Sequence, residues 1–63
     1  MMRTPQETAV HMAGKYGKYT ASMHVTQYAL NHRFDAIDRG EAIPNDGERY
    51  WMEVMECLRQ LRS

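Results

Sequence analysis

Lys18 to Arg39 reads KYTASMHVTQYALNHRFDAIDR and is the longest run without glycine or proline in this 63-residue chain. Its apolar residues recur at helical spacing, but they fall on two opposite sides. One side is narrow and rich in alanine: Ala21, Val25, Tyr28, Ala29, His32 and Ala36. The other side carries bulkier residues: Tyr19, Met23, Leu30, Phe34 and Ile37. A helix with two apolar sides is usually packed between two neighbours, so we expect this central helix to need more than one partner.

The residues before this stretch predict a short first helix. Thr4-Pro5-Gln6-Glu7 offers an N-cap threonine, a proline at the first helical position and a glutamate placed to close a capping box. We therefore expect a helix over residues 5–16, ended by Gly17 in a left-handed conformation. Three turns are not stable alone, so this helix must dock on the rest of the chain.

The residues after the central stretch predict a turn and a last helix. We expect the central helix to cover residues 18–39 and to end at a glycine cap, Gly40. Asn45 followed three residues later by Glu48 predicts a second capping box, at the start of a helix over residues 46–61. That helix has one broad apolar stripe: Tyr50, Trp51, Val54, Met55, Cys57, Leu58 and Leu61. The short loop favours an antiparallel hairpin with the central helix.

Composition limits the class of protein. The eight lysines and arginines balance eight acidic residues, whereas nucleic-acid-binding domains normally carry a basic face. No apolar run approaches the roughly 20 residues of a membrane span, and no signal-peptide pattern follows the N-terminal methionines, so we expect a cytoplasmic protein. The single Cys57 forms no intrachain disulfide and fits a reducing compartment. Because a core this small rarely supplies more than about 3 to 5 kcal/mol, we expect a homodimer.

The sequence predicts no catalytic, cofactor or metal site. His11, His24, His32 and Cys57 include no pair at the short spacings of a zinc site. Residues 14–18 contain two glycines and two lysines, but they lack the full phosphate-loop pattern. We interpret the histidines as structural or solvated and Cys57 as a small core residue.

A second set of residues is a candidate for protein contacts. Neighbouring residues point about 100° apart on a helix, so one ring of Tyr50-Trp51 can fill the core while the other reaches a partner. We interpret Trp51 as the core anchor, and both roles stay open for Tyr50. The predicted interaction residues are Tyr19, Met23, Leu30, Phe34, Ile37 and Tyr50. Which side of the central helix faces outward also stays open, because the alanine side allows the closest approach and the bulky side buries more area.

A loose pattern runs through most of the chain: Tyr16-Gly17, Ala21, Gly40, Tyr50-Trp51, Val54, Leu58 and Leu61. In this pattern the chain resembles a group of small, uncharacterised helical proteins of bacteria and their phages. The loop containing Ile43-Pro44 is less regular than that pattern. The resemblance implies a helical fold and no activity.

We therefore expect one all-α domain over residues 1–63, with a short N-terminal helix and a long antiparallel hairpin that dimerises into a helical bundle. The leading functional hypothesis is a non-enzymatic interaction or regulatory protein, a phage or mobile-element product that binds a host protein. The alternative is a small nucleic-acid-binding regulator. Its candidate contacts are Arg3, Lys15, Lys18, Arg33, Arg39, Arg49, Arg59 and Arg62.

Overall fold

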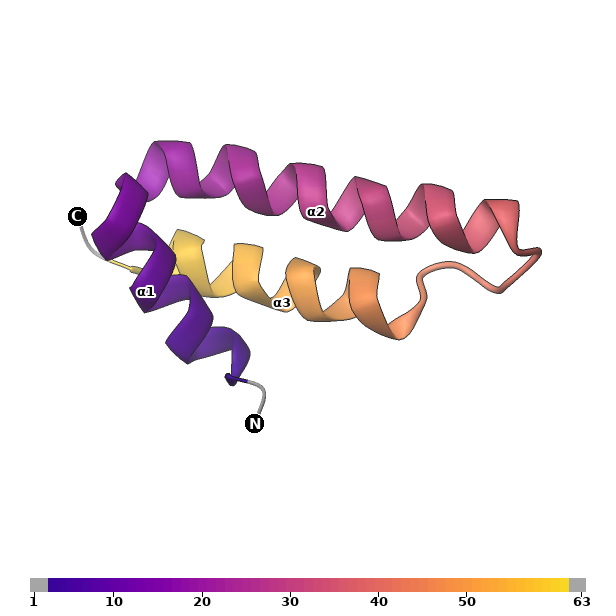
Figure 1. Ribbon diagram of the computed structural model, residues 1–63. Coiled ribbons are helices and arrows are strands. Elements are labelled where there is room, and N and C mark those ends of the chain that lie inside the picture. Colours follow the sequence, from indigo (N-terminus) through magenta and orange to yellow (C-terminus); the bar gives the residue numbers. More distant parts are fainter. Residues whose placement is uncertain (1–2, 62–63) are drawn as a thin grey trace.

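The computed structural model describes residues 3–61, which form helices and no strand (Figure 1). The helices are α1 (Pro5–Tyr16), α2 (Lys18–Asp38) and α3 (Asp46–Gln60). α3 lies alongside α2, and α1 packs on both of them near the start of α2 and the end of α3 (Figure 1). The all-α prediction is confirmed. Each helix begins at the predicted residue, and α2 and α3 end one residue earlier than predicted.

The start of α1 contains the predicted capping box. The Glu7 N–H donates to Thr4 Oγ1 at 3.2 Å, and the Thr4 N–H donates to Glu7 Oε1 at 3.3 Å. Gly17 then joins α1 to α2 with φ 84° and ψ 154°. The positive φ favours glycine, but the extended ψ differs from the left-handed helical cap that we expected. This geometry turns the chain directly into α2.

α2 ends in a Schellman motif. The Gly40 N–H donates to the Ile37 carbonyl at 3.1 Å, and the Glu41 N–H donates to the Ala36 carbonyl at 2.8 Å. Gly40 has φ 70°, the left-handed conformation that this motif requires. Arg39 is the C-cap residue, so Gly40 has the predicted role one position beyond the cap.

The start of α3 contains only half of the predicted capping box. The Glu48 N–H donates to the Asn45 side-chain oxygen at 2.8 Å, as predicted. The Glu48 carboxylate, however, pairs with Arg33 of α2 at 2.7 Å. The second half of the prediction was wrong because a charged partner on the neighbouring helix attracts this carboxylate more strongly than a backbone N–H does.

The core lies where the three helices meet. The buried apolar residues there are Ala9, Met12, Ala21, Val25, Val54 and Leu58, and Ala36 is buried apart from them near the end of α2. Only three large side chains among the described residues are fully buried: Leu58, Val25 and Val54. The alanine-rich side of α2 therefore faces inward, and its small residues let α2 approach its neighbours closely. Partly buried apolar residues, among them Trp51 and Met55, pack around the three fully buried side chains.

His32 and Gly47 form a close contact where α2 meets the start of α3. A Cβ at residue 47 would lie 2.6 Å from Cε1 of the His32 ring and 2.8 Å from Cγ. The Asn45 side-chain amide also donates to the His32 carbonyl, at 3.3 Å. At the other end of the pair, Lys18 Nζ donates to the Leu61 carbonyl at 2.7 Å. Polar contacts thus join α2 to the residues just before and just after α3.

Candidate interaction surface

Five bulky residues of α2 lie on the side away from the core, and we call this surface the outer face of α2. The exposed fractions are 80% for Tyr19, 59% for Met23, 37% for Leu30, 56% for Phe34 and 54% for Ile37. Each was predicted from the sequence as an interaction residue. The structure resolves the choice that periodicity left open, because the alanine side packs inside and the bulky side is exposed.

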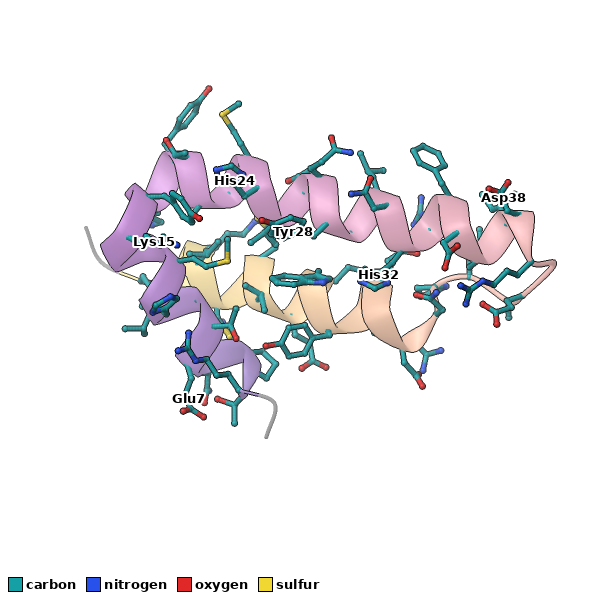
Figure 2. All side chains as sticks on the ribbon, in the orientation of Figure 1. Glu7, Lys15, His24, Tyr28, His32 and Asp38 are labelled. Atoms are coloured by element: carbon teal, nitrogen blue, oxygen red, sulfur yellow. The ribbon has the colours of Figure 1, made fainter. Side chains whose placement is uncertain are left out.

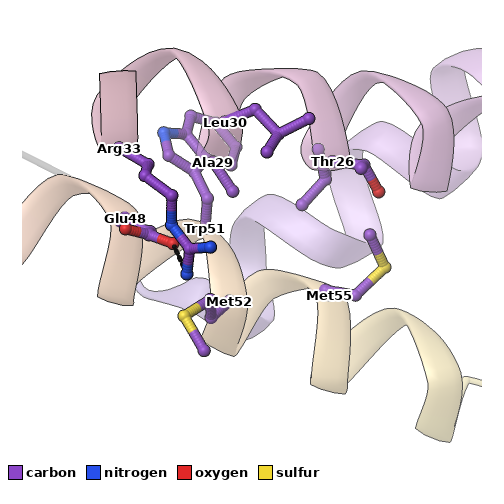
Figure 3. Close-up of a pocket in the computed structure, with 9 residues that line it drawn as sticks. Thr26, Ala29, Leu30, Arg33, Glu48, Trp51, Met52 and Met55 are labelled. Carbon is purple, nitrogen blue, oxygen red and sulfur yellow. Dashed lines mark ion pairs between the residues drawn. The ribbon is translucent and has the colours of Figure 1, made fainter. Parts of the chain in front are cut away.

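A groove runs between α2 and α3 beside the outer face, and we call it the α2–α3 groove. One part, about 230 Å³ in volume, is lined by Val25, Thr26, Ala29, Leu30, Arg33, Glu48, Trp51, Met52 and Met55 (Figure 3). A wider part of about 660 Å³ is lined by Tyr19, Ser22, Met23, Thr26, Met55 and Arg59. Thr26 and Met55 line both parts, so the groove is continuous with the outer face. Met52, which is 51% exposed, extends this apolar surface onto α3.

An ion pair lies in the narrower part of the groove (Figure 3). Arg33 Nη2 lies 2.7 Å from Glu48 Oε2, and the side chains are 43% and 4% exposed respectively. A buried carboxylate is stable only with a partner, so Arg33 is needed to hold Glu48 in place. Within residues 3–61, Arg33 Nε and Glu48 Oε1 have no hydrogen-bond partner. Sequence reasoning missed this pair, because a 15-residue separation gives no periodic signal.

Trp51 packs against α2, as its predicted role as a core anchor requires. Its ring centroid lies 4.8 Å from that of Tyr28, and His24 lies between Tyr28 and Tyr16 at 6.3 and 4.7 Å. Figure 2 shows His24 and Tyr28 projecting from α2. His24 is thus part of a row of neighbouring rings, stacked on Tyr28 and tilted against Tyr16, in line with its structural interpretation.

Tyr50 makes its polar contacts within the chain. Its hydroxyl donates to the Arg3 carbonyl at 3.0 Å and also contacts Thr8 Oγ1. Its ring meets Trp51 edge-on at 5.1 Å. Tyr50 therefore joins α3 to α1, and it does not belong to the outer face of α2 with which it was grouped from the sequence.

The described part of the chain contains no cluster of three or more His, Cys, Asp or Glu residues that could hold a metal ion. No helix within residues 3–61 is long and apolar enough to cross a membrane. Several basic residues already have partners: Arg33 pairs with Glu48, Arg39 with Asp35 at 3.2 Å, and Arg59 with Glu56 at 3.7 Å. Arg62, another predicted nucleic-acid contact, lies outside the described residues.

Comparisons with protein-family models, with curated proteins and with solved structures found no match to this chain.

Proposed function

We propose that this chain is a non-enzymatic interaction protein and that the outer face of α2 is its contact surface. The observation that carries the proposal is the exposure of five large apolar side chains along one side of a 21-residue helix. At about 150 to 250 Å² for a whole aromatic side chain, the exposed fractions of Tyr19 and Phe34 alone amount to about 200 to 340 Å². Monomeric proteins rarely expose contiguous apolar patches above a few hundred Å².

Self-association is part of this proposal. A standard protein–protein interface buries about 800 Å² on each partner, and Tyr19 and Phe34 supply at least a quarter of that area. Met23, Leu30, Ile37 and the neighbouring Met52 add to it. Two antiparallel α2–α3 hairpins that meet through α2 would form a four-helix core, with an α1 attached to each. Such a dimer compensates for the small core of one chain.

The partner class beyond a second copy is a host protein, which would replace the second copy on the outer face of α2. This part of the proposal comes from the resemblance to small helical proteins of bacteria and their phages, and it makes the chain a regulatory product of a phage or mobile element in the cytoplasm. A nucleic acid is not favoured, because the net charge is zero and three of the arginines pair with carboxylates.

A capture experiment with matched variants tests the proposal. Immobilised wild-type protein, Phe34→Asp and Asn31→Asp are each exposed to a lysate of the source cells. Both variants place a new aspartate at an exposed position of α2, but Asn31 lies outside the outer face, and an aspartate there keeps the oxygen that accepts from Gln27 at 2.9 Å. We expect wild type and Asn31→Asp to retain the same protein and Phe34→Asp to lose it. Equal retention by all three would refute the outer face as the contact surface.

A further inference from the structure

The spacing of the residues on the outer face of α2 is nearly the same in both directions along the chain. Its apolar residues, with Thr26 between them, follow one another at intervals of three or four residues, which is the spacing of a helix–helix seam. Tyr19 and Ile37, Met23 and Phe34, and Thr26 and Leu30 form three pairs that are each centred near residue 28. Rotation by a half turn about that point therefore places each residue opposite the other member of its pair. An isologous dimer needs this self-complementarity.

The charges along α2 have a polarity that distinguishes the two possible directions of such a dimer. Between Glu7 and Asp35 the sequence contains no acidic residue, and Lys15 and Lys18 flank the start of α2. Asp35, Asp38 and Glu41 lie around its end, where Arg39 pairs with Asp35 at 3.2 Å and leaves Asp38 and Glu41 as the net negative charge. Lys15, in α1 beside the start of α2, and Asp38, the last residue of α2, are both exposed and lie far apart along the molecule (Figure 2). A parallel dimer would bring like charges together, whereas an antiparallel dimer places the basic end on the acidic end.

The helix dipole favours the same direction. The start of a helix carries a partial positive charge and its end a partial negative charge, so two antiparallel α2 helices attract each other at both ends. The α2–α3 groove also gives the partner's side chains room beside the seam. Met52 and Met55 line this groove, and methionine adapts its shape to large apolar neighbours.

From this spacing and charge polarity we infer that the outer face of α2 is occupied by α2 of a second copy of this chain, running antiparallel and centred near residue 28. The inference rests on the proposed function, and it specifies the occupant, the direction and the register. In this arrangement Tyr19 lies opposite Ile37 of the second copy, and Met23 lies opposite Phe34. The methionine–phenylalanine contact adds a sulfur–aromatic interaction in each half of the seam.

Cysteine cross-linking tests the direction and the register together. Tyr19→Cys and Ile37→Cys are each made in a Cys57→Ala background, and both positions are exposed, so neither change disturbs the core. In the antiparallel dimer residue 19 meets residue 37, whereas the two copies of residue 19 are separated by about 27 Å along the helix axis. A disulfide needs Cα atoms within about 7 Å. After mild oxidation and denaturation without a reductant, which separates chains that are not covalently linked, we expect the mixed variants to give a species of twice the 7.4 kDa chain mass and each variant alone to give 7.4 kDa.

Three results would overturn the inference. Cross-linking of each variant with itself would indicate a parallel dimer. Equal cross-linking of Tyr19→Cys with Glu53→Cys, an exposed position on α3 outside the groove, would indicate chance collisions. If no disulfide forms and the reduced protein in solution has a mass of 7.4 kDa, no second copy is bound. In that last case a loss of lysate capture by Phe34→Asp would still support the proposed function, so the two failures are distinguishable.

Discussion

Replacing Gly47 by alanine has two effects of opposite sign on the free energy of unfolding. Alanine is a better helix former than glycine by about 1 kcal/mol in a helix interior, so at residue 47, the second residue of α3, it would stabilise the helix by up to that amount. The new Cβ would, however, lie 2.6 Å from Cε1 and 2.8 Å from Cγ of His32, so the whole imidazole ring must move rather than only its tip. Forcing an extra carbon into a packed contact costs about 1 to 3 kcal/mol. We therefore expect Gly47→Ala to lower the free energy of unfolding by up to about 2 kcal/mol.

His32→Ala provides the control for this reasoning, because it removes the ring that the new Cβ would meet. In the His32→Ala background, Gly47→Ala should stabilise the protein by up to about 1 kcal/mol, the helix-propensity gain alone. Urea unfolding of the wild type, both single variants and the double variant measures the four free energies of unfolding. All four are measured at one protein concentration, because the stability of a self-associating protein depends on it. A stabilising effect of Gly47→Ala in both backgrounds would refute the close contact with His32.

Three further substitutions test other contacts by the same unfolding measurement. Leu58→Ala should cost about 2 to 5 kcal/mol, because Leu58 is fully buried and truncation leaves a cavity; a loss below 1 kcal/mol would contradict its place in the core. Arg33→Ala should cost about 1 to 3 kcal/mol, because it leaves the Glu48 carboxylate buried without its partner; an unchanged free energy would mean that the pair contributes nothing. Tyr50→Phe should cost about 1 kcal/mol through the lost contacts with Thr8 and the Arg3 carbonyl, and no loss would mean that these bonds do not stabilise α1 on α3.

Helix positions could be predicted because their signals are local. Thr4, Pro5 and Glu7 fix the start of α1 through backbone groups within one turn, and Gly40 ends α2 through bonds of the same range. Periodicity also identified both sides of α2 correctly. It could not decide which side faces inward, because small residues favour a close approach and large residues favour burial of area. In the structure the alanine side faces inward, where the three helices meet and Ala21 and Val25 are fully buried.

The contacts that sequence reasoning missed are the ones between distant residues. Glu48 looked like a capping residue because Asn45 stands three positions before it, and only the approach of α2 brings Arg33 to its carboxylate. The two roles of Tyr50 likewise could not be separated from the sequence, because its position on the stripe of α3 is the same in either case. Its hydroxyl contacts with Arg3 and Thr8 depend on how α1 docks. The way one helix packs on another depends on tertiary contacts, which the spacing of residues along a single helix does not specify.

We propose the outer face of α2 as a contact surface between copies of this chain. Its most direct test is the solution mass of the wild-type protein and of Phe34→Asp, measured by light scattering at micromolar concentration, with circular dichroism to verify that both are helical. We expect twice the 7.4 kDa chain mass for the wild type and a lower mass for the variant. A folded wild-type protein with a mass of 7.4 kDa would contradict the proposal.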